Sequence, residues 1–368
     1  MRAGEPLHLS IDASSAADRG RARGQVLREV LPGVLELYSR LFASIGVTER
    51  QLREHAGRIG DSVARWHEAT AAELAGVATG SGLEPWNVLA LNGRTEILAL
   101  AGSASPECST LVIDPTPESV SPFGIQTWDW HDELSRGWHT QSVAGTRVGY
   151  TGLTEAGILA KIGINDAGVG VFFNILGHRD DAPTAVPIHL LAARLLADAE
   201  SVAEAIDIVA QTPMASSGAL TLVDRDSVAC VEISPAGTAI LLPRNGFVVH
   251  TNHFLAASNA MGEKSGLYDP DSQQRLALIE ARMADAVRAG SVPTCAVDLA
   301  QVLRSGPGEP QLCCVPSPDA QFGDRWSTLA TIALSPASCT AQIKVGSPVA
   351  DTEFRTMVAP GATVGGLR

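Results

Sequence analysis

Several features that would assign this sequence of 368 residues to a common class are scarce or missing. Only six cysteines are present and no CxxC pair occurs, which argues against a disulfide framework and a structural zinc site. No run of five basic residues occurs and the formal net charge is −13, so a nucleic-acid partner is disfavoured. No uncharged apolar run approaches the ~18 residues of a membrane helix. Because the first fifteen residues also lack the apolar core of a secretory signal, we expect a cytoplasmic protein without a membrane partner.

Motifs of several common chemistries are also missing. The chain has no phosphate-binding GxxxxGKS or GxxxxGKT loop, and no GxSxG or HExxH motif. Two clusters have side chains that ligate metals, namely Asp129, His131 and Asp132, and His250 with His253. Neither cluster has its remaining ligands at a recognised spacing, so we expect hydrogen-bonded histidines and no metal.

The pattern of apolar residues predicts helices first and strands afterwards. Residues 14–100 follow helical spacing, with a kink at Pro32 and a second apolar stripe over 63–77 that ends near Gly80 and Gly82. From Ser109 onward, short β-rich runs alternate with turn residues. We predict strands at 110–113, 124–128, 140–143, 147–151, 157–164, 169–174, 219–223, 228–233, 238–242, 247–251, 327–334 and 340–345.

Helices are expected to interrupt the strands in two places. The first covers residues 188–211, where Ser201 and Glu204 are spaced as a capping box. The second runs over 272–288 and stops at Gly290, and a short helix follows Thr294. Hydrophobic residues make up 45% of the chain, enough for a sizeable core. Since strands cluster and helices cluster, the sequence predicts one globular α+β unit.

Cys108 stands where the helical pattern changes to the β pattern. A cysteine thiolate is a strong nucleophile when a base or a positive charge lowers the pKa of the thiol. If the peptide bond before Cys108 is cut, its own α-amine, with a pKa of about 8, becomes available as that base. Spacing alone leaves the alternative of a buried strand cysteine open.

Five short segments, in this order along nearly the whole chain, resemble a known family. They are LNGRTE at 91–96, CST at 108–110, WDW at 128–130, TEAGI at 154–158 with Lys161, Gly163, Asn165 and Gly168, and HTNH at 250–253. In these segments the chain resembles the acyl-coenzyme A:isopenicillin N acyltransferase family, also called the C45 peptidase family, of N-terminal-nucleophile hydrolases.

This resemblance implies an αββα sandwich, in which two antiparallel sheets lie between helical layers. It also implies a proenzyme: Cys108 attacks the carbonyl of Glu107, and the chain is cut into an α chain, 1–107, and a β chain, 108–368, which remain associated. By the same resemblance Cys108 is nucleophile and base, Asp129 orients its amine, and Asn252 donates its amide to the oxyanion.

Three further residues receive roles from the resemblance. Asn174 and Thr110 are expected to supply an oxyanion donor or a substrate contact, with a plain strand-end role as the alternative for Asn174. Arg325 aligns with a family arginine near the active site, where it would steady the chain termini or bind a substrate carboxylate, and a surface ion pair with Asp324 or another neighbour is its alternative. Glu107 departs from the glycine that precedes the nucleophile in the fungal penicillin enzymes, and glycine eases strained backbone conformations.

The resemblance implies an enzyme that cleaves or transfers an acyl group of a small amide or thioester through a Cys108 thioester, without a cofactor. Acyl transfer from coenzyme A in secondary metabolism is one alternative, with acyl-coenzyme A as co-substrate. A non-catalytic relative that binds a small ligand is another. A metal-dependent hydrolase built on His131 and His253 is a third, and it predicts sensitivity to chelators.

Overall fold

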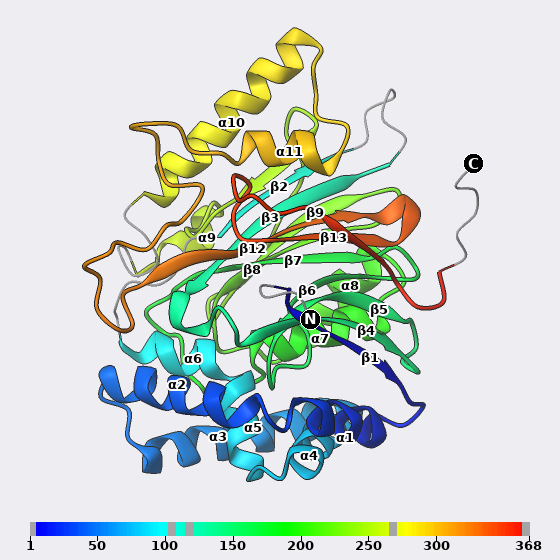
Figure 1. Cartoon of the computed structure of the whole chain (residues 1–368). Coiled ribbons are helices and arrows are strands. Elements are labelled where there is room, and N and C mark those ends of the chain that lie inside the picture. The colour runs from blue at the N-terminus through cyan, green and yellow to red at the C-terminus, as the bar shows by residue number, and fades with distance from the viewer. Residues whose placement is uncertain (1–4, 102–107, 115–120, 265–270, 363–368) are drawn as a thin grey trace.

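The computed structural model of the chain describes residues 5–101, 108–114, 121–264 and 271–362. Its centre consists of two facing β-sheets (Figure 1). The eight-stranded sheet has the order β1 (Leu7–Asp12), β4 (Trp138–Ala144), β5 (Tyr150–Glu155), β6 (Ile162–Asn165), β7 (Gly170–Ile175), β8 (Gly218–Val223), β9 (Val228–Ser234) and β10 (Gly237–Leu241). The six-stranded sheet has the order β11 (Phe247–His250), β2 (Ser109–Ile113), β3 (Phe123–His131), β12 (Trp326–Ser335), β13 (Thr340–Val345) and β14 (Arg355–Val358).

Neighbouring strands are antiparallel except β1 and β4, which are parallel. Strands such as β2, β7, β8 and β9 are buried along their whole length. A sheet that is covered on both faces favours continuous apolar runs, which explains why these strands show little alternation in sequence.

Helices form the outer layers. They are α1 (Ala16–Leu27), α2 (Leu31–Ser44), α3 (Glu49–Trp66), α4 (Glu68–Ser81), α5 (Pro85–Asn92), α6 (Arg94–Leu98), α7 (Ile188–Asp198), α8 (Val202–Gln211), α9 (Ala257–Ala260), α10 (Ser272–Ala289) and α11 (Ala296–Val302), with 3-10 turns η1 (Ala99–Ala101), η2 (Asp132–Leu134) and η3 (Pro336–Ser338). Helices α7 and α8 contact β6–β9, and α10 and α11 contact β11, β2 and β3. The expected α+β sandwich of two mainly antiparallel sheets between helical layers is therefore confirmed.

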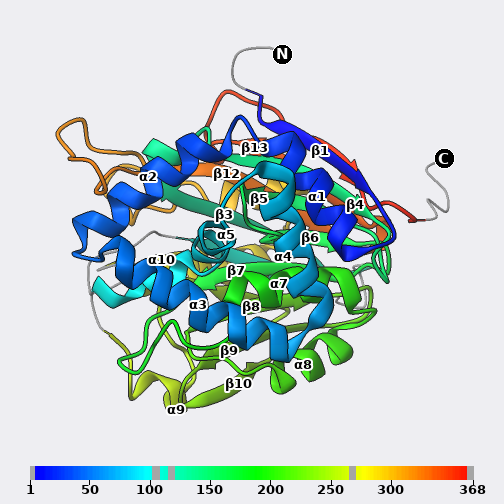
Figure 2. The same cartoon turned by 90° about the horizontal axis from the view of Figure 1, so that it is seen from below.

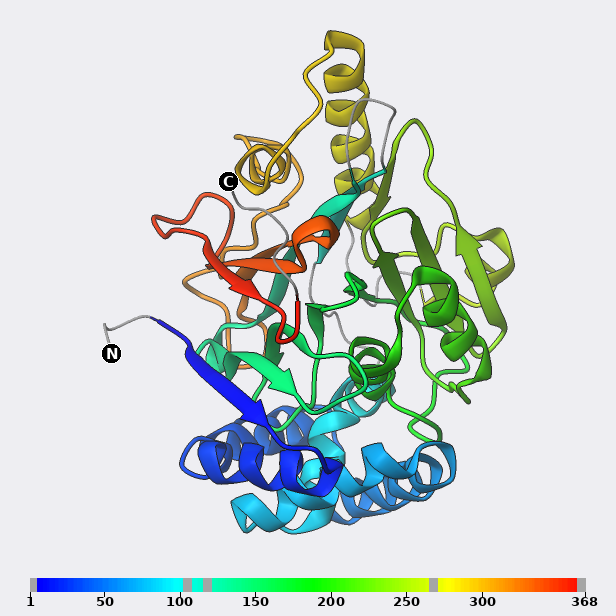
Figure 3. The same cartoon turned by 90° about the vertical axis from the view of Figure 1, so that its right-hand side faces the viewer.

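The outer face of the six-stranded sheet has a hydrophobic core of its own. Leu111 and Ile125 from the sheet pack there against Ile279 of α10 and Leu299 of α11. Helices α1–α6 lie together below the sandwich in Figure 1 and in front of it in Figure 2. Figure 3 shows the yellow α10 at the top and the blue N-terminal helices at the bottom, with the sheets between them. None of the described helices is long and apolar enough to cross a membrane.

Local signals explain where the helices begin and end. Thr48 and Gln51 form a capping box at the start of α3, and Ser15 caps α1. Gly82 and Gly290 end α4 and α10 in the left-handed conformation, at φ +79° and +64°. Pro32 lies in the first turn of the new helix α2, where proline is well tolerated, so the predicted kink is a break between α1 and α2.

Helices α1 and α4 pack with their backbones in contact. A Cβ on Gly20 would lie 1.9 Å from the Glu73 carbonyl oxygen, and one on Gly80 would lie 2.1 Å from that of Arg21. Gly24 and Gly76 are similarly crowded. Only glycine allows this approach, because any side chain at these positions would overlap the facing backbone.

Most predicted strands are present, with shifted ends, and β13 matches its predicted limits. The predicted strand at 157–164 is wrong in its first half, because Gly157 turns at φ +92° and only β6 is a strand. In this turn the backbone N–H of Leu159 donates to the side chain of Asn92, not to a neighbouring strand. Strands β1 and β14 were not predicted, and the helix predicted at 188–211 is divided into α7 and α8.

Candidate active site around Cys108

Cys108 directly precedes β2 and is buried, with 3% of its surface exposed. The first pair of the β2–β3 ladder is Ser109 with Thr127, and continuing this register places Cys108 beside Trp128. The backbone N–H of Asp129 hydrogen-bonds to the Cys108 thiol. The ladder between β3 and β12 contains a bulge here, because Thr328 pairs with Asp129 while Ala330 pairs with Trp128. Bulges bend and twist a strand locally, and they are common beside active sites.

Side chains from separate elements hold both backbone groups of Cys108. The nitrogen of Cys108 donates to Asn252 Oδ1 at 2.9 Å, and its carbonyl oxygen accepts from Asn174 Nδ2 at 2.9 Å and from Arg275 Nη1 at 3.3 Å. Arg275 also donates to Asn252 Oδ1 at 3.0 Å and to Ser109 Oγ at 2.9 Å. Two donors facing Asn252 Oδ1 fix the orientation of this amide, whose nitrogen donates to the Ile175 carbonyl at 3.0 Å.

Asn174 joins the two sheets at this point. It lies on β7 of the eight-stranded sheet, and its Oδ1 accepts from Thr110 Oγ1 on β2 at 2.7 Å. Its Nδ2 also donates to the His250 carbonyl at 3.4 Å. Asn174, Thr110 and His250 are fully buried, so each of these polar groups needs a partner within the protein. The structure thus brings Thr110, Asn174 and Asn252 together around Cys108.

The HTNH segment forms the turn that presents Asn252. His250 Nε2 lies 3.0 Å from Glu232 Oε1, and Glu232 also accepts from the backbone N–H groups of Leu255 and Ala256. His253 Nδ1 lies 2.7 Å from Ser272 Oγ, which accepts from the Asn252 N–H at 2.9 Å. Both histidines are therefore hydrogen-bonded in the turn, as the sequence predicted. Among the described residues, no three metal-ligating side chains gather into a site.

The electrostatic environment of Cys108 combines opposite influences. Burial and the Asp129 carboxylate raise the pKa of the Cys108 thiol to about 12, although Lys161, the Asp129 N–H and Arg275 act in the opposite direction. Asp129 is itself buried, with 1% of its surface exposed. A thiol with so high a pKa is almost fully protonated at neutral pH, so reactivity requires a base or an additional positive charge at this place.

Arg275 was missed in the sequence, and Arg325 was named instead. The Arg325 side chain is 46% exposed and pairs with Asp132 at 3.2 Å. It therefore forms a surface ion pair, which was the alternative prediction for this residue. Arg275 is fully buried and pairs with Asp271 at 2.9 Å. A signal was present, since Arg275 shares a four-residue spacing with Ile279 and Met283 on the buried face of α10. Glu107 lies outside the described residues.

The LNGRTE and TEAGI segments meet beside this site. Asn92 donates to the Gly157 carbonyl and accepts from the Leu159 N–H, and Arg94 forms a two-point ion pair with Glu155. The Arg94–Glu155 pair is buried, and Lys161 Nζ lies 3.0 Å from Glu155 Oε1. The two segments, in which Arg94 and Glu155 are 61 residues apart, are thus joined by direct hydrogen bonds and an ion pair.

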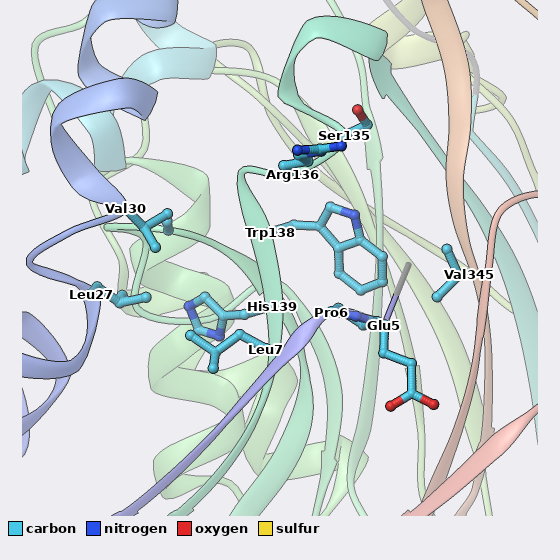
Figure 4. Close-up of a pocket in the computed structure, with 11 residues that line it drawn as sticks. Glu5, Pro6, Leu7, Leu27, Val30, Ser135, Arg136, Trp138, His139 and Val345 are labelled. Carbon is cyan, nitrogen blue, oxygen red and sulfur yellow. The ribbon is translucent and has the colours of Figure 1, made fainter. Parts of the chain in front are cut away.

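A cavity of about 470 Å³ lies at the β1 edge, and Figure 4 shows its lining residues. They are Glu5, Pro6, Leu7, Leu27, Val30, Ser135, Arg136, Trp138, His139, Ala156 and Val345. Cys108 is not among them, but Trp138 packs edge-on against Trp128, with ring centroids 5.9 Å apart. Trp138 of the cavity wall therefore contacts Trp128, the residue beside Cys108. The cavity itself is not lined by Cys108, Asn174, Asn252 or Arg275.

The chain is similar in sequence to a curated relative and in structure to several solved proteins. A curated relative, the 40 kDa form of acyl-coenzyme A:6-aminopenicillanic-acid-acyltransferase of Emericella nidulans, is 28% identical over 260 residues, which is 68% of each chain. Among solved structures, the Caenorhabditis elegans ortholog of N-acylethanolamine-hydrolyzing acid amidase is 14% identical with a TM-score of 0.46, over 69% of this chain and 100% of its own. A variant of the Clostridium perfringens conjugated bile acid hydrolase is 11% identical with a TM-score of 0.49, over 70% and 94%.

The family model for acyl-coenzyme A:6-aminopenicillanic acid acyl-transferase matches residues 116–350. This range is more than half of the chain and includes Asp129, Asn174 and Asn252, while Cys108 precedes it. The chain therefore belongs to the acyl-coenzyme A:6-aminopenicillanic acid acyl-transferase family.

Proposed function

We propose that the protein is a self-processing enzyme that cleaves or transfers the acyl group of a small amide or thioester through Cys108. The observation that carries this proposal is the position of Cys108: its nitrogen and carbonyl are held by Asn252, Asn174 and Arg275 at the buried start of β2. A structural strand cysteine needs no such set of polar side chains, because β-ladder bonds satisfy its backbone.

Self-processing would begin with attack of the Cys108 sulfur on the carbonyl carbon of Glu107. The Glu107–Cys108 peptide bond breaks, the nitrogen takes up the thiol proton, and the acyl group moves to sulfur. Water then hydrolyses this thioester, which leaves a carboxylate on Glu107 and a free thiol and α-amine on Cys108. In this proposal segment 1–107 stays associated, supported by the buried Arg94–Glu155 pair and by the addition of β1 to β4.

In the mature enzyme the freed α-amine of Cys108 would act as the base. It takes the thiol proton, the sulfur attacks the substrate carbonyl, and the proton passes to the leaving amine as a thioester forms. Asp129 would orient the α-amine, and Asn252 Oδ1 already accepts from the same nitrogen. Asn252 Nδ2 carries two hydrogens and donates one to Ile175, so we assign the oxyanion contact to the other.

Water or a second amine would resolve the thioester, giving hydrolysis or acyl transfer. The Emericella relative is named an acyltransferase that uses acyl-coenzyme A, which favours an acyl thioester as one acyl donor. We therefore propose both N-acyl amides and acyl-coenzyme A as substrates to test, with an amine acceptor present or absent. Retained activity in the presence of a chelator, and its loss on alkylation of Cys108, are expected for cysteine chemistry.

The first experiment is the intact mass of the wild type beside Cys108→Ala, under reducing and denaturing conditions. We expect wild type to resolve into 1–107 and 108–368, while Cys108→Ala stays whole. Cys295→Ala is the matched control, because Cys295 is an exposed cysteine and its loss should leave the cut unchanged. A wild type that remains one chain after long incubation would reject self-processing and favour a ligand-binding relative.

A further inference from the structure

A cluster of buried charges connects three parts of the chain beside Cys108. Glu155, at the end of β5, accepts from Arg94 Nε of α6 at 3.1 Å and from Lys161 Nζ at 3.0 Å, and from Tyr38 of α2. Arg94 and Lys161 are fully buried. Trp130 covers Arg94, whose guanidinium carbon lies 3.8 Å from the ring centre. The cluster is therefore closed off from solvent.

The charges of this cluster do not balance. In the direct ion pairs of the described residues, two cations, Arg94 and Lys161, share the single carboxylate of Glu155, and the buried Glu96 acts on Arg94 only at longer range. Arg94 alone already makes the two-point pair that neutralises a carboxylate. Keeping a second cation buried is costly unless another negative charge is close to it. Lys161 thus has a positive charge in excess of what Glu155 requires.

Lys161 contacts the neighbour of Cys108 in the sheet. Its Nζ lies 4.2 Å from the centre of the Trp128 ring, and Trp128 is the residue beside Cys108 in the β2–β3 register. Lys161 favours the thiolate form of Cys108 electrostatically, and Cys108 in return favours the charged form of Lys161. Burial nevertheless lowers the pKa of Lys161 to about 8.

We propose that Lys161 is a positioning residue of this site, whose ammonium group stabilises the thiolate of Cys108. The inference rests on the proposed function, in which the thiol proton moves to the Cys108 α-amine. The negative charge left on sulfur then faces Lys161 until the sulfur bonds to the acyl carbon. Because Arg94 already neutralises Glu155, the positive charge of Lys161 is available to stabilise the thiolate. Arg94 belongs to segment 1–107, so this segment influences the reactivity of a cysteine outside it.

The experiment is the pH dependence of alkylation of Cys108 by iodoacetamide, followed by peptide mass. Exposed Cys295 in the same sample is the internal reference. Wild type, Lys161→Met, Lys161→Arg and Lys344→Met are compared; Lys344 bonds to the Thr352 carbonyl and serves as the matched lysine control. The other charged or titratable groups around Cys108 and Lys161 are Asp129, Arg275, Glu155, Arg94, His189 and Tyr38, and Glu96 and His131 act on Arg94; all are unchanged in these proteins.

We expect Cys108 of Lys161→Met to be alkylated about tenfold more slowly at pH 7. The midpoint of its alkylation rate against pH should be raised by about one pH unit. Lys161→Arg should stay near the wild-type midpoint, and Lys344→Met should match wild type. A Lys161→Met chain that stays uncut while Lys161→Arg is cut would support the inference too. Superimposed profiles of wild type and Lys161→Met would overturn it.

A second variant keeps the inference testable if Lys161→Met does not fold. Arg94→Met removes the other cation, so Lys161 alone has to neutralise Glu155, and the midpoint of the Cys108 alkylation profile should again rise. An unchanged midpoint in folded Arg94→Met would contradict the charge count. A wild type that is neither cut nor alkylated at Cys108 would instead overturn the proposed function, and this inference with it.

Discussion

Replacing Glu155 by Gln should destabilise the protein more than replacing either cation that pairs with it. Glu155→Gln leaves Arg94 and Lys161 buried together without the carboxylate that pairs with both of them. Arg94→Met leaves the pair of Lys161 with Glu155, and Lys161→Met leaves the pair of Arg94 with Glu155. The order of the three variants therefore follows from the count of charges, although all three replace a single buried side chain.

The size of the effect follows from burial. Removing one partner of a buried ion pair costs about 3–5 kcal/mol, because it leaves an uncompensated charge away from water. We expect Glu155→Gln to lose at least this much of its free energy of unfolding. Each cation variant loses charged hydrogen bonds but keeps a matched pair, which corresponds to about 1.5–3 kcal/mol.

The assay is urea unfolding followed by tryptophan fluorescence, since Trp128 and Trp130 contact the two cations directly. All variants carry Cys108→Ala, so that every chain is compared uncut. Glu232→Gln, in a different buried pair, controls for loss of a carboxylate elsewhere. If Glu155→Gln has the same free energy of unfolding as Lys161→Met, the carboxylate of Glu155 does not stabilise the cluster as proposed. The argument from the pairing of charges is then refuted.

Three other outcomes are expected. Asn252→Ala should slow turnover of an N-acyl amide by the cut chain by about 10²–10³, measured as the initial rate of product formation; a change of only a few-fold would contradict the oxyanion role. Gly20→Ala should lower the free energy of unfolding by about 1–3 kcal/mol or more through overlap with the Glu73 carbonyl, while Gly57→Ala, which has open space around it, should raise it by about 0.5–1 kcal/mol. Burial raises the pKa of Glu232, but His250 and the backbone N–H groups of Leu255 and Ala256 bring it below its ordinary value. Its stabilising contribution is therefore present above the unfolded pKa of about 4.3 and lost as pH falls through the folded pKa; acid titration of wild type against Glu232→Gln measures it, and parallel curves would contradict this sign.

The sequence alone was sufficient for the elements whose local signals agree with their tertiary setting. The predicted limits of β13 match the structure, and α10 runs to the glycine that was expected to stop it. The change from helices to strands at Cys108 is also present, because α1–α6 precede it and β2 follows directly. In these places periodicity, capping and turn residues all favour one structure.

The elements that were missed depend on partners far away in the chain. Strand β1 exists because it pairs with β4, more than 120 residues later, and six residues of alternating burial gave only a weak local signal. Residues 156–161 have the composition of a strand, but Asn92 and Gly157 turn them. The side chains around Cys108 illustrate the same point, since Asn252 and Asn174 were named from motifs, whereas Arg275 was not.

The sequence by itself determined most of the segments that become helices and strands, the position of Cys108 where the two patterns meet, and the resemblance to the family. Only the tertiary structure decided which charges meet: Arg275 lies at the Cys108 carbonyl, Arg325 pairs with Asp132, and Lys161 meets Glu155 and Arg94. The physical reason is that local propensity acts over a few neighbouring residues, whereas the pairing of buried charges depends on groups that folding brings together from distant parts of the chain.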